Sequence, residues 1–168
     1  MPLETNIFNS FDAGASHTCA VDNNSTPWCW GNGGSGQLGN GSTSSETSPV
    51  SVDNITTATS VSAGFYHTCV VLSDGTVNCW GSGTYGQLGN GSTSNSYIPV
   101  TVDNIATATS VSSGENHSCA VLDNGTAKCW GQGSYGQLGN GSTSNSSTPV
   151  SVSGISTATS VSAGQYHT

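Results

Sequence analysis

Cysteine and histidine are the side chains in this 168-residue sequence that could do chemistry, and both recur at fixed steps. The cysteines form three pairs with ten residues from one member to the next, and a histidine precedes each pair by two residues. The set comprises Cys19 with Cys29, Cys69 with Cys79, Cys119 with Cys129, and His17, His67, His117 and His167. Such residues can form disulfides, bind zinc, or act as a nucleophile and its base.

The turn between the cysteines of a pair decides whether they can form a disulfide. A two-residue turn would place Cys69 and Cys79 on opposite faces of a hairpin, because side chains alternate along a strand. A three-residue loop over 73–75, with Gly75 in the left-handed conformation, would set the two cysteines directly opposite each other. We expect the three-residue loop, and hence a disulfide in each pair.

Free buried thiols and a metal site are the alternatives to disulfides. Zinc sites usually bring two ligands within two to four residues of each other, and the sequence contains no Cys-x-x-Cys. Each disulfide would close a loop of about ten residues and stabilise the fold by roughly 2–3 kcal/mol. Because disulfides persist in oxidising compartments, we expect an extracellular or cell-surface location, without a metal or another cofactor.

The four histidines have nearly the same neighbours in every copy. A catalytic site needs a unique constellation of groups, and repetition argues against one. We expect a structural role, with the ring nitrogens bridging neighbouring backbone groups, and we expect no enzyme activity.

The spacing of these residues belongs to a repeat of 50 residues, which also places Trp30, Trp80 and Trp130 one period apart. The sequence divides into repeats 1–50, 51–100 and 101–150 and a partial repeat 151–168, which we treat as one domain, 1–168. The conserved spacing of the tryptophans predicts that they pack between adjacent repeats.

Short runs of Val, Thr, Ile and Tyr alternate with clusters of Gly, Asn, Ser and Asp within each repeat. This pattern predicts an all-β fold with strands near 58–62, 67–72, 76–80 and 99–102. Four short strands in fifty residues are typical of a β-propeller blade.

The repeat resembles the RCC1 (regulator of chromosome condensation) repeat, above all its cysteine-containing version in bacterial secreted and surface proteins. The resemblance is carried by the motifs at 64–69, 79–81, 86–93 and 99–102, which read Gly-x-x-His-Thr-Cys, Cys-Trp-Gly, Gly-Gln-Leu-Gly-Asn-Gly-Ser-Thr and Pro-Val-x-Val. It implies RCC1-like propeller blades, usually seven to a ring. Three full four-stranded repeats and a partial fourth would then form an incomplete propeller. The family includes a nucleotide exchange factor on chromatin and a protein inhibitor of β-lactamase.

The composition limits the core and the partners. Leu, Ile, Val and Phe make up about 17% of the residues, below the roughly 20% under which a highly charged chain is expected to be disordered. Only ten side chains are charged, so we expect a folded chain whose thin apolar core is supplemented by the disulfides. The net charge is −8 with a single basic residue, which disfavours nucleic acid as a partner. No run approaches the roughly 20 apolar residues of a membrane helix, so we expect no membrane insertion.

Residues that vary while their neighbours repeat are candidates for contact with a partner. They are Trp28, Phe65, Tyr66, Tyr97 and Glu115. Asn-x-Ser/Thr sequences, which could carry glycans in a eukaryotic secretory pathway, occur at Asn40, Asn54, Asn90, Asn116, Asn124, Asn140 and Asn145.

Three blades expose strand edges and apolar faces, which leads to two functional hypotheses. The first is a non-catalytic extracellular structural or adhesive scaffold that assembles with itself head to tail into a ring or filament. The alternative is a protein-binding or inhibitory module that docks on one partner through its rim loops. Nearly identical loops favour the scaffold. The first repeat departs from the others with Phe8 for Ala58 and Phe11 for Val61, as a capping repeat would.

Overall fold

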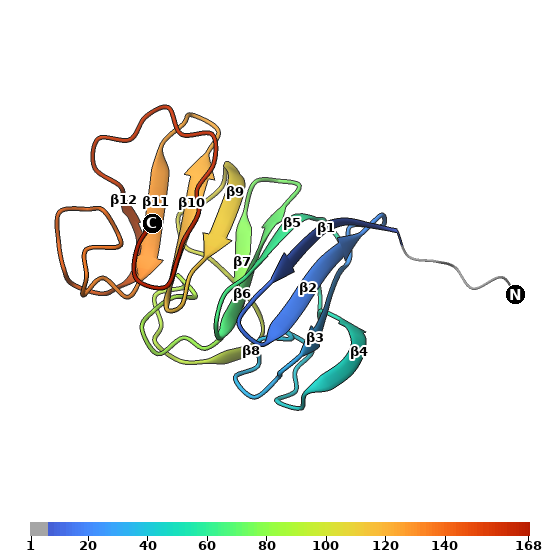
Figure 1. Cartoon of the computed structure of the whole chain (residues 1–168). Helices are drawn as coiled ribbons and strands as arrows, with labels where there is room; N and C mark the ends of the chain where they lie inside the picture. Colours follow the sequence, from blue (N-terminus) through green and yellow to red (C-terminus); the bar gives the residue numbers. More distant parts are fainter. Residues whose placement is uncertain (1–6) are drawn as a thin grey trace, which may run out of the picture.

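Twelve strands form three four-stranded sheets in the computed structural model, which describes residues 7–168 (Figure 1). Blade 1 contains β1 (Phe8–Ala13), β2 (His17–Asp22), β3 (Pro27–Gly31) and β4 (Glu46–Ser51). Blade 2 contains β5 (Ala58–Ala63), β6 (His67–Leu72), β7 (Val77–Gly81) and β8 (Ser96–Thr101). Blade 3 contains β9 (Ala108–Ser113), β10 (His117–Leu122), β11 (Ala127–Gly131) and β12 (Ser146–Ser151).

Each blade is an antiparallel sheet whose strands follow one another in chain order. The three blades lie side by side, and their first strands are neighbours: β1 contacts β5, and β5 contacts β9 (Figure 1). There is no helix among the described residues. The all-β fold, with propeller blades that match the 50-residue repeat, is therefore confirmed.

The fourth strand of each blade starts earlier than the sequence predicted. In blade 2 it begins at Ser96 rather than Pro99, because Ser96 still pairs with Gly81 of β7. The register shifts between this pair and the pair of Val100 with Cys79. Pro99 lies inside this strand. A proline has no N–H to donate to a ladder and is tolerated on an edge strand, which β8 is.

The hairpin between β6 and β7 has the predicted three-residue loop. The Gly75 N–H donates to the Leu72 carbonyl and the Leu72 N–H donates to the Thr76 carbonyl, with Gly75 in the left-handed region at φ 79°. This geometry sets Cys69 opposite Cys79 in the ladder, and the two residues form a disulfide. Disulfides at the corresponding positions join Cys19 to Cys29 and Cys119 to Cys129.

The core lies between the blades because the second strand of a blade is buried on both faces. In β6, Thr68 contacts blade 1 while His67 contacts blade 3. Val70 likewise packs in the cluster that joins blades 1 and 2, and Val71 packs in the cluster that joins blades 2 and 3. Strand alternation thus sends successive side chains to different neighbouring blades.

The partial fourth repeat begins the next blade without completing it. Residues 158–163 have the same sequence as β5 but form no strand, and no second strand pairs with them among the described residues. They nevertheless lie against blade 3, where the Ala163 N–H donates to the Ser112 hydroxyl at 2.9 Å. Strand formation here depends on a pairing partner more than on the sequence of the segment.

The Ser25→Gly substitution is expected to stabilise the protein by about 0.5–1 kcal/mol. Ser25 occupies the left-handed position of the first hairpin at φ 62°, where the other two hairpins have Gly75 and Gly125. Denaturant-induced unfolding would measure the change. The reciprocal substitution Gly75→Ser should destabilise, since a Cβ there would lie 2.6 Å from the Ala106 carbonyl oxygen. An unchanged or lower unfolding midpoint for Ser25→Gly would contradict the prediction.

Candidate functional site

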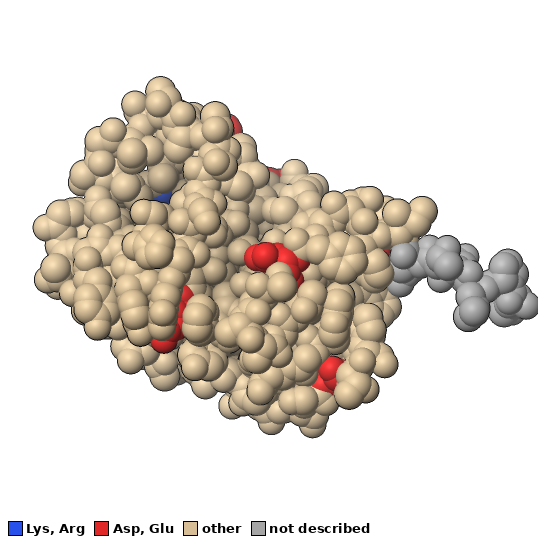
Figure 2. Space-filling view, viewed as in Figure 1, with Lys and Arg blue, Asp and Glu red and all other residues tan. Residues whose placement is uncertain are grey.

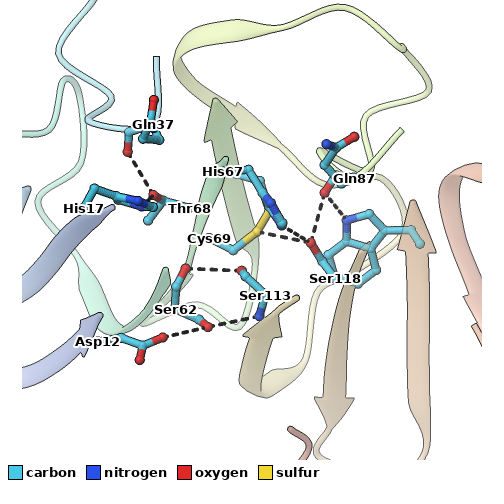
Figure 3. The surroundings of a disulfide bond; sticks show 12 residues. Asp12, His17, Gln37, Ser62, His67, Thr68, Cys69, Gln87, Ser113 and Ser118 are labelled. Atoms are coloured by element: carbon cyan, nitrogen blue, oxygen red, sulfur yellow. Dashed lines mark hydrogen bonds between the residues drawn. A yellow bond between two sulfur atoms is a disulfide. The ribbon is translucent and has the colours of Figure 1, made fainter. Parts of the chain in front are cut away.

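A chain of buried hydrogen bonds joins each blade to the next (Figure 3). Between blades 1 and 2, His17 Nε2 lies 2.8 Å from the Thr68 hydroxyl, which donates to the Gln37 main-chain carbonyl at 2.9 Å. The Trp80 indole N–H donates to the same carbonyl at 2.8 Å. We call these four groups the interblade relay. It uses two groups from each blade and therefore fixes how the blades meet.

The relay repeats at the next interface with His67, Ser118, Gln87 and Trp130 (Figure 3). At the far side of blade 3 only part of it is present. His117 Nε2 lies 3.0 Å from the Thr168 hydroxyl, which donates to the Gln137 carbonyl. No indole reaches that carbonyl within residues 7–168.

The relay assigns the histidine tautomer. The single hydroxyl hydrogen of Thr68 is donated to the Gln37 carbonyl, so the Thr68 oxygen accepts a hydrogen bond from His17, whose Nε2 therefore carries the hydrogen. In His17, His67 and His117 the other ring nitrogen, Nδ1, is buried and has no hydrogen-bond partner among the described residues. The histidines thus bond to a hydroxyl of the next blade, and the expectation that they bridge backbone groups is replaced by this side-chain contact.

Burial keeps these histidines neutral. Desolvation lowers the pKa of His67 to about 3, and the neighbouring His17 and His117 lower it further. Desolvation also lowers the pKa of His17 and of His117 to about 4, opposed at His17 by Asp12. A protonated ring would place a second N–H at Nδ1, where nothing accepts it. A neutral imidazole held this way is a structural donor.

The disulfide of one blade packs beneath the tryptophan of the next. Cys19, Cys29 and Leu38 of blade 1 form one buried cluster with Val70 and Trp80 of blade 2. The cluster between blades 2 and 3 is built in the same way, with Ala120 in place of Val70; it contains Cys69, Cys79, Leu88, Ala120 and Trp130. Trp80 and Trp130 are fully buried there, as packing between repeats predicted.

The third cluster lacks its tryptophan. Cys119, Cys129 and Leu138 are buried with Val152 and Val161 packed against them. In place of an indole there is a cavity of about 440 Å³, lined by Leu138, Gly139, Val161 and Thr168 among others. We call this cavity the blade 3 socket. Its position corresponds to the places that Trp80 and Trp130 fill.

The glycines of the loop after the third strand show the same difference. A Cβ at Gly39 or Gly89 would lie 2.7 Å from the indole nitrogen of Trp80 or Trp130, whereas a Cβ at Gly139 would meet only Val152. The Gln137 side-chain nitrogen is buried without a hydrogen-bond partner within the described residues. The corresponding nitrogens of Gln37 and Gln87 donate to Asn32 and Ser82 within their own blades, so the socket differs from the other two interfaces by the missing indole.

The opposite open face, on blade 1, presents Trp30. This side chain is half-buried, in contrast to Trp80 and Trp130. Phe11 packs edge-on against it with ring centroids 6.3 Å apart, and Phe8 packs on Phe11 at 5.2 Å. The three aromatic rings form the blade 1 face. Phe11 remains 58% exposed, so the face is only partly covered.

Trp28, a candidate partner contact, is bound within its own hairpin. Its indole N–H donates to Asp22 at 2.9 Å, and Asp22 also accepts from the Asn24 and Thr26 N–H groups. Leu72 stands where Asp22 would in the second copy. Asp22 and Trp28 both differ from the other copies and are bonded to each other. This internal contact explains the variation at Trp28, so no partner protein is needed to explain it.

The other candidate contacts lie apart from one another. Tyr97 is half-exposed and packs on Gly36 of blade 1, where its carbonyl accepts from the Gly41 N–H at 3.0 Å. Phe65 and Tyr66 stack edge-on at 6.2 Å at the end of β5. Glu115 accepts from Asn116 and raises the pKa of the nearby Tyr166. The structure does not bring these residues together into one surface.

The sequons differ in exposure. Asn54, Asn124 and Asn145 are exposed, and Asn40, Asn90 and Asn140 are half-buried. Asn116 is buried, and its side-chain nitrogen, which would carry a glycan, donates to Glu115 and Gln132.

The inner strands are lined by small side chains. Alanine, serine and glycine residues at and just after the ends of β1, β5 and β9, together with residues 162–164, surround a hollow of about 380 Å³, where Asp12 accepts from the Ser62 hydroxyl and the Ala63 N–H. Figure 2 shows isolated acidic groups on a surface otherwise almost free of charge. Across residues 7–168, no three His, Cys, Asp or Glu side chains gather as metal ligands. The same residues include no helix long and apolar enough to cross a membrane.

Sequence reasoning missed two members of the relay. The hydroxyl at Thr68 and Ser118 could have been found, since a hydroxyl follows the histidine in every copy. The acceptor at Gln37 and Gln87 is a main-chain carbonyl, which no residue type reveals.

Two models of the regulator of chromosome condensation (RCC1) repeat match this sequence. One matches residues 28–71, 74–121 and 124–168, and the other matches residues 8–37, 58–87 and 108–137. Each match of the first model runs from a third strand into the next repeat and so spans an interface between blades. A comparison with curated proteins gives no match.

Solved structures with the same fold include Prp20p from Saccharomyces cerevisiae, reported with its binding properties to Gsp1p and histones. It is 24% identical, with a TM-score of 0.80 over 94% of this chain and 42% of that one. Yeast RCC1 (Prp20) bound to Kap60 is 23% identical, with a TM-score of 0.74 over 86% and 37%. Human WBSCR16 is 25% identical, with a TM-score of 0.74 over 89% and 41%. The chain spans less than half the length of each.

Thr68→Val should destabilise the protein by about 1–3 kcal/mol, because His17 would keep a buried N–H without an acceptor. Thr68→Ser should cost much less, since Ser118 serves in the same place at the next interface. Urea unfolding of the two variants would compare them. An equal loss of unfolding free energy in Thr68→Val and Thr68→Ser would show that the stabilisation does not come from the hydroxyl.

Lowering the pH from 7 to 4 should weaken the fold through the relay histidines. Their pKa values are near 6.5 when unfolded and about 3 to 4 when folded, so the unfolded state binds protons that the folded state excludes. The contribution of these histidines to the free energy of unfolding is fully present well above pH 6.5, and it is lost progressively as the pH falls from 6.5 toward the pKa of the folded state. In His67→Gln, which keeps an N–H for Ser118, the pH slope of the unfolding free energy should be smaller by about one proton. A slope identical to that of the wild type would contradict this assignment.

Proposed function

The chain belongs to the RCC1 repeat family, and on that premise we propose that it is a non-catalytic, protein-binding propeller scaffold that associates with copies of itself head to tail. The scaffold works outside the cell or on its surface.

The observation that carries this proposal is the complementarity of the two open faces. The interface between blades occurs twice inside the chain, each time with a tryptophan over a disulfide. The blade 3 socket is one half of that interface, and the blade 1 face with Trp30 has the tryptophan of the other half. Different surfaces meeting in this way generate a ring or a filament.

A role in protein binding is also supported by the relatives. Prp20p is described by its binding to Gsp1p and histones, and yeast RCC1 is bound to Kap60. The present chain has one basic side chain, and that side chain, Lys128, donates to the Asn104 carbonyl. Proteins are therefore favoured over nucleic acid as partners.

The compartment is inferred from the disulfides. All six cysteines are paired, and each pair lies in a core between blades or on the open side of blade 3. Reduction would leave thiols in these positions and remove a constraint worth roughly 2–3 kcal/mol per bond. Such a fold is suited to an oxidising environment.

The proposal predicts association that depends on concentration. Sedimentation velocity of the non-reduced protein should show the average mass rising above that of one chain as the concentration increases. The intact mass of each chain should be six hydrogens below the reduced mass, two for each of the three disulfides. A protein that stays monomeric over the whole range would contradict self-association and favour docking on a different partner through the rim loops.

A further inference from the structure

Loops at one end of the blades hold four of the five tyrosines, and these loops are of two kinds. One kind joins the first strand of a blade to the second, and the other kind follows the third strand. The Ser82 N–H donates to the Tyr66 carbonyl, so the two kinds meet in blade 2. The Gln132 N–H likewise donates to the Asn116 carbonyl in blade 3. We call these loops the tyrosine face; they comprise residues 14–16, 32–35, 64–66, 82–85, 114–116, 132–135 and 164–166.

The tyrosine face is continuous from blade to blade. The Ala15 N–H donates to the Gly64 carbonyl at 3.3 Å, and the Phe65 N–H donates to the Gly114 carbonyl at 3.2 Å. A ligand on this face therefore contacts more than one blade. Two members of the set that varies between copies, Trp28 and Tyr97, lie outside these loops, in β3 and β8.

The tyrosines of this face are exposed even where their blade has a neighbour on each side. Tyr66 is 45% exposed and Tyr85 is 39% exposed, and both belong to blade 2. The fold requires neither ring, because serines, Ser16 and Ser35, take their places in blade 1. Aromatic rings that are exposed and do not serve the core indicate a binding surface.

Both rings of blade 2 are held in place before any ligand arrives. Phe65 packs edge-on against Tyr66 with ring centroids 6.2 Å apart. The Tyr85 N–H donates to the buried Gln87 side chain at 2.9 Å, which fixes the loop that carries the ring. Rings held in this way lose little conformational freedom when a ligand binds.

The two ends of the blades differ in chemistry. The tyrosine face has Phe65 and four tyrosines but only one charged side chain, Glu115. The loops at the opposite end, 22–26, 52–57, 72–76, 102–107, 122–126 and 152–157, contain no aromatic residue. They contain five aspartates, Asp22, Asp53, Asp74, Asp103 and Asp123. A basic partner would be drawn to that end, whereas the tyrosine face suits a neutral ligand.

Neutral amides and hydroxyls lie between the aromatic rings of the tyrosine face. They are Asn32, Asn116, Gln132 and Gln165, together with Ser35, Ser82, Thr84 and Ser134. These groups donate and accept hydrogen bonds without carrying charge. A sugar ring has a flat face of C–H groups and a rim of hydroxyl groups, so it matches both the aromatic rings and the groups between them.

We propose that the tyrosine face binds a neutral oligosaccharide. One sugar ring stacks on Tyr66 and another stacks on Tyr85, and the sugar hydroxyls bond to the amides and hydroxyls beside these rings. The site is separate from the surfaces that meet in head-to-tail association, so it does not depend on whether copies associate. The oligosaccharide is a ligand in addition to the protein partners of the proposed function.

Titration calorimetry of the whole chain with neutral hexasaccharides of glucose, of N-acetylglucosamine, of mannose and of galactose tests this proposal. We expect at least one of them to bind, with an affinity that stays the same as the salt concentration is raised, because the ligand has no charge to screen. Failure of all of them to bind overturns the proposal.

Two variants locate the site with residues that the fold already accepts. Tyr66→Ser and Tyr85→Ser each introduce the residue of blade 1, so both chains should fold as the wild type does. Each should weaken binding of the hexasaccharide at least about tenfold, as loss of a central contact residue does. Trp28→Asn is the control, because it replaces an aromatic residue outside the face by the residue of blade 2, and its affinity should not change.

Two further results contradict the proposal. Wild-type affinity in both Tyr66→Ser and Tyr85→Ser places the sugar elsewhere on the molecule. A polylysine peptide whose binding is weakened by these two substitutions and by salt shows that the face takes a basic partner, in place of a neutral sugar.

Discussion

Burial of each blade on both faces is the constraint on which this structure depends. The alternating side chains of β6 serve two different cores, with Thr68 and Val70 on one side and His67 and Val71 on the other. A single blade therefore has no core of its own, as expected of repeat proteins in which each unit contacts only its neighbours. Every blade stabilises the next, and the outermost blades keep one apolar face without a neighbour.

The interblade relay and the disulfides together compensate for a small apolar content. Packing of Val and Leu alone would allow neighbouring blades to slide, because apolar contact has no direction. The Gln37 carbonyl accepts from both Thr68 and Trp80, and these bonds have direction. The neutral His17 adds a third link from the other blade. A buried network in which nearly every donor is satisfied specifies one arrangement of the blades.

The sequence predicted those features that side chains encode locally. The repeat, four strands in each blade and the register of Cys69 with Cys79 all follow from spacing and turn chemistry, and the structure confirms them apart from the earlier start of the fourth strand. The Gln37 acceptor could not be predicted, because a main-chain carbonyl has no signature in the sequence. Trp28 was chosen for its variation, yet it varies together with Asp22, to which it is bonded. Without the fold, a change that compensates for a neighbour looks the same as a change made for a partner.

Near-identity of the repeats has a physical consequence for association. When the interface between blades is the same at each step, the chain does not distinguish its own next blade from the blade of another copy by contacts alone. Within a chain, the next blade is favoured over a blade of another copy because covalent linkage gives it a high effective concentration. The first repeat departs from this identity at Phe8 and Phe11, so the blade 1 face that these residues form with Trp30 differs from the faces that meet inside the chain.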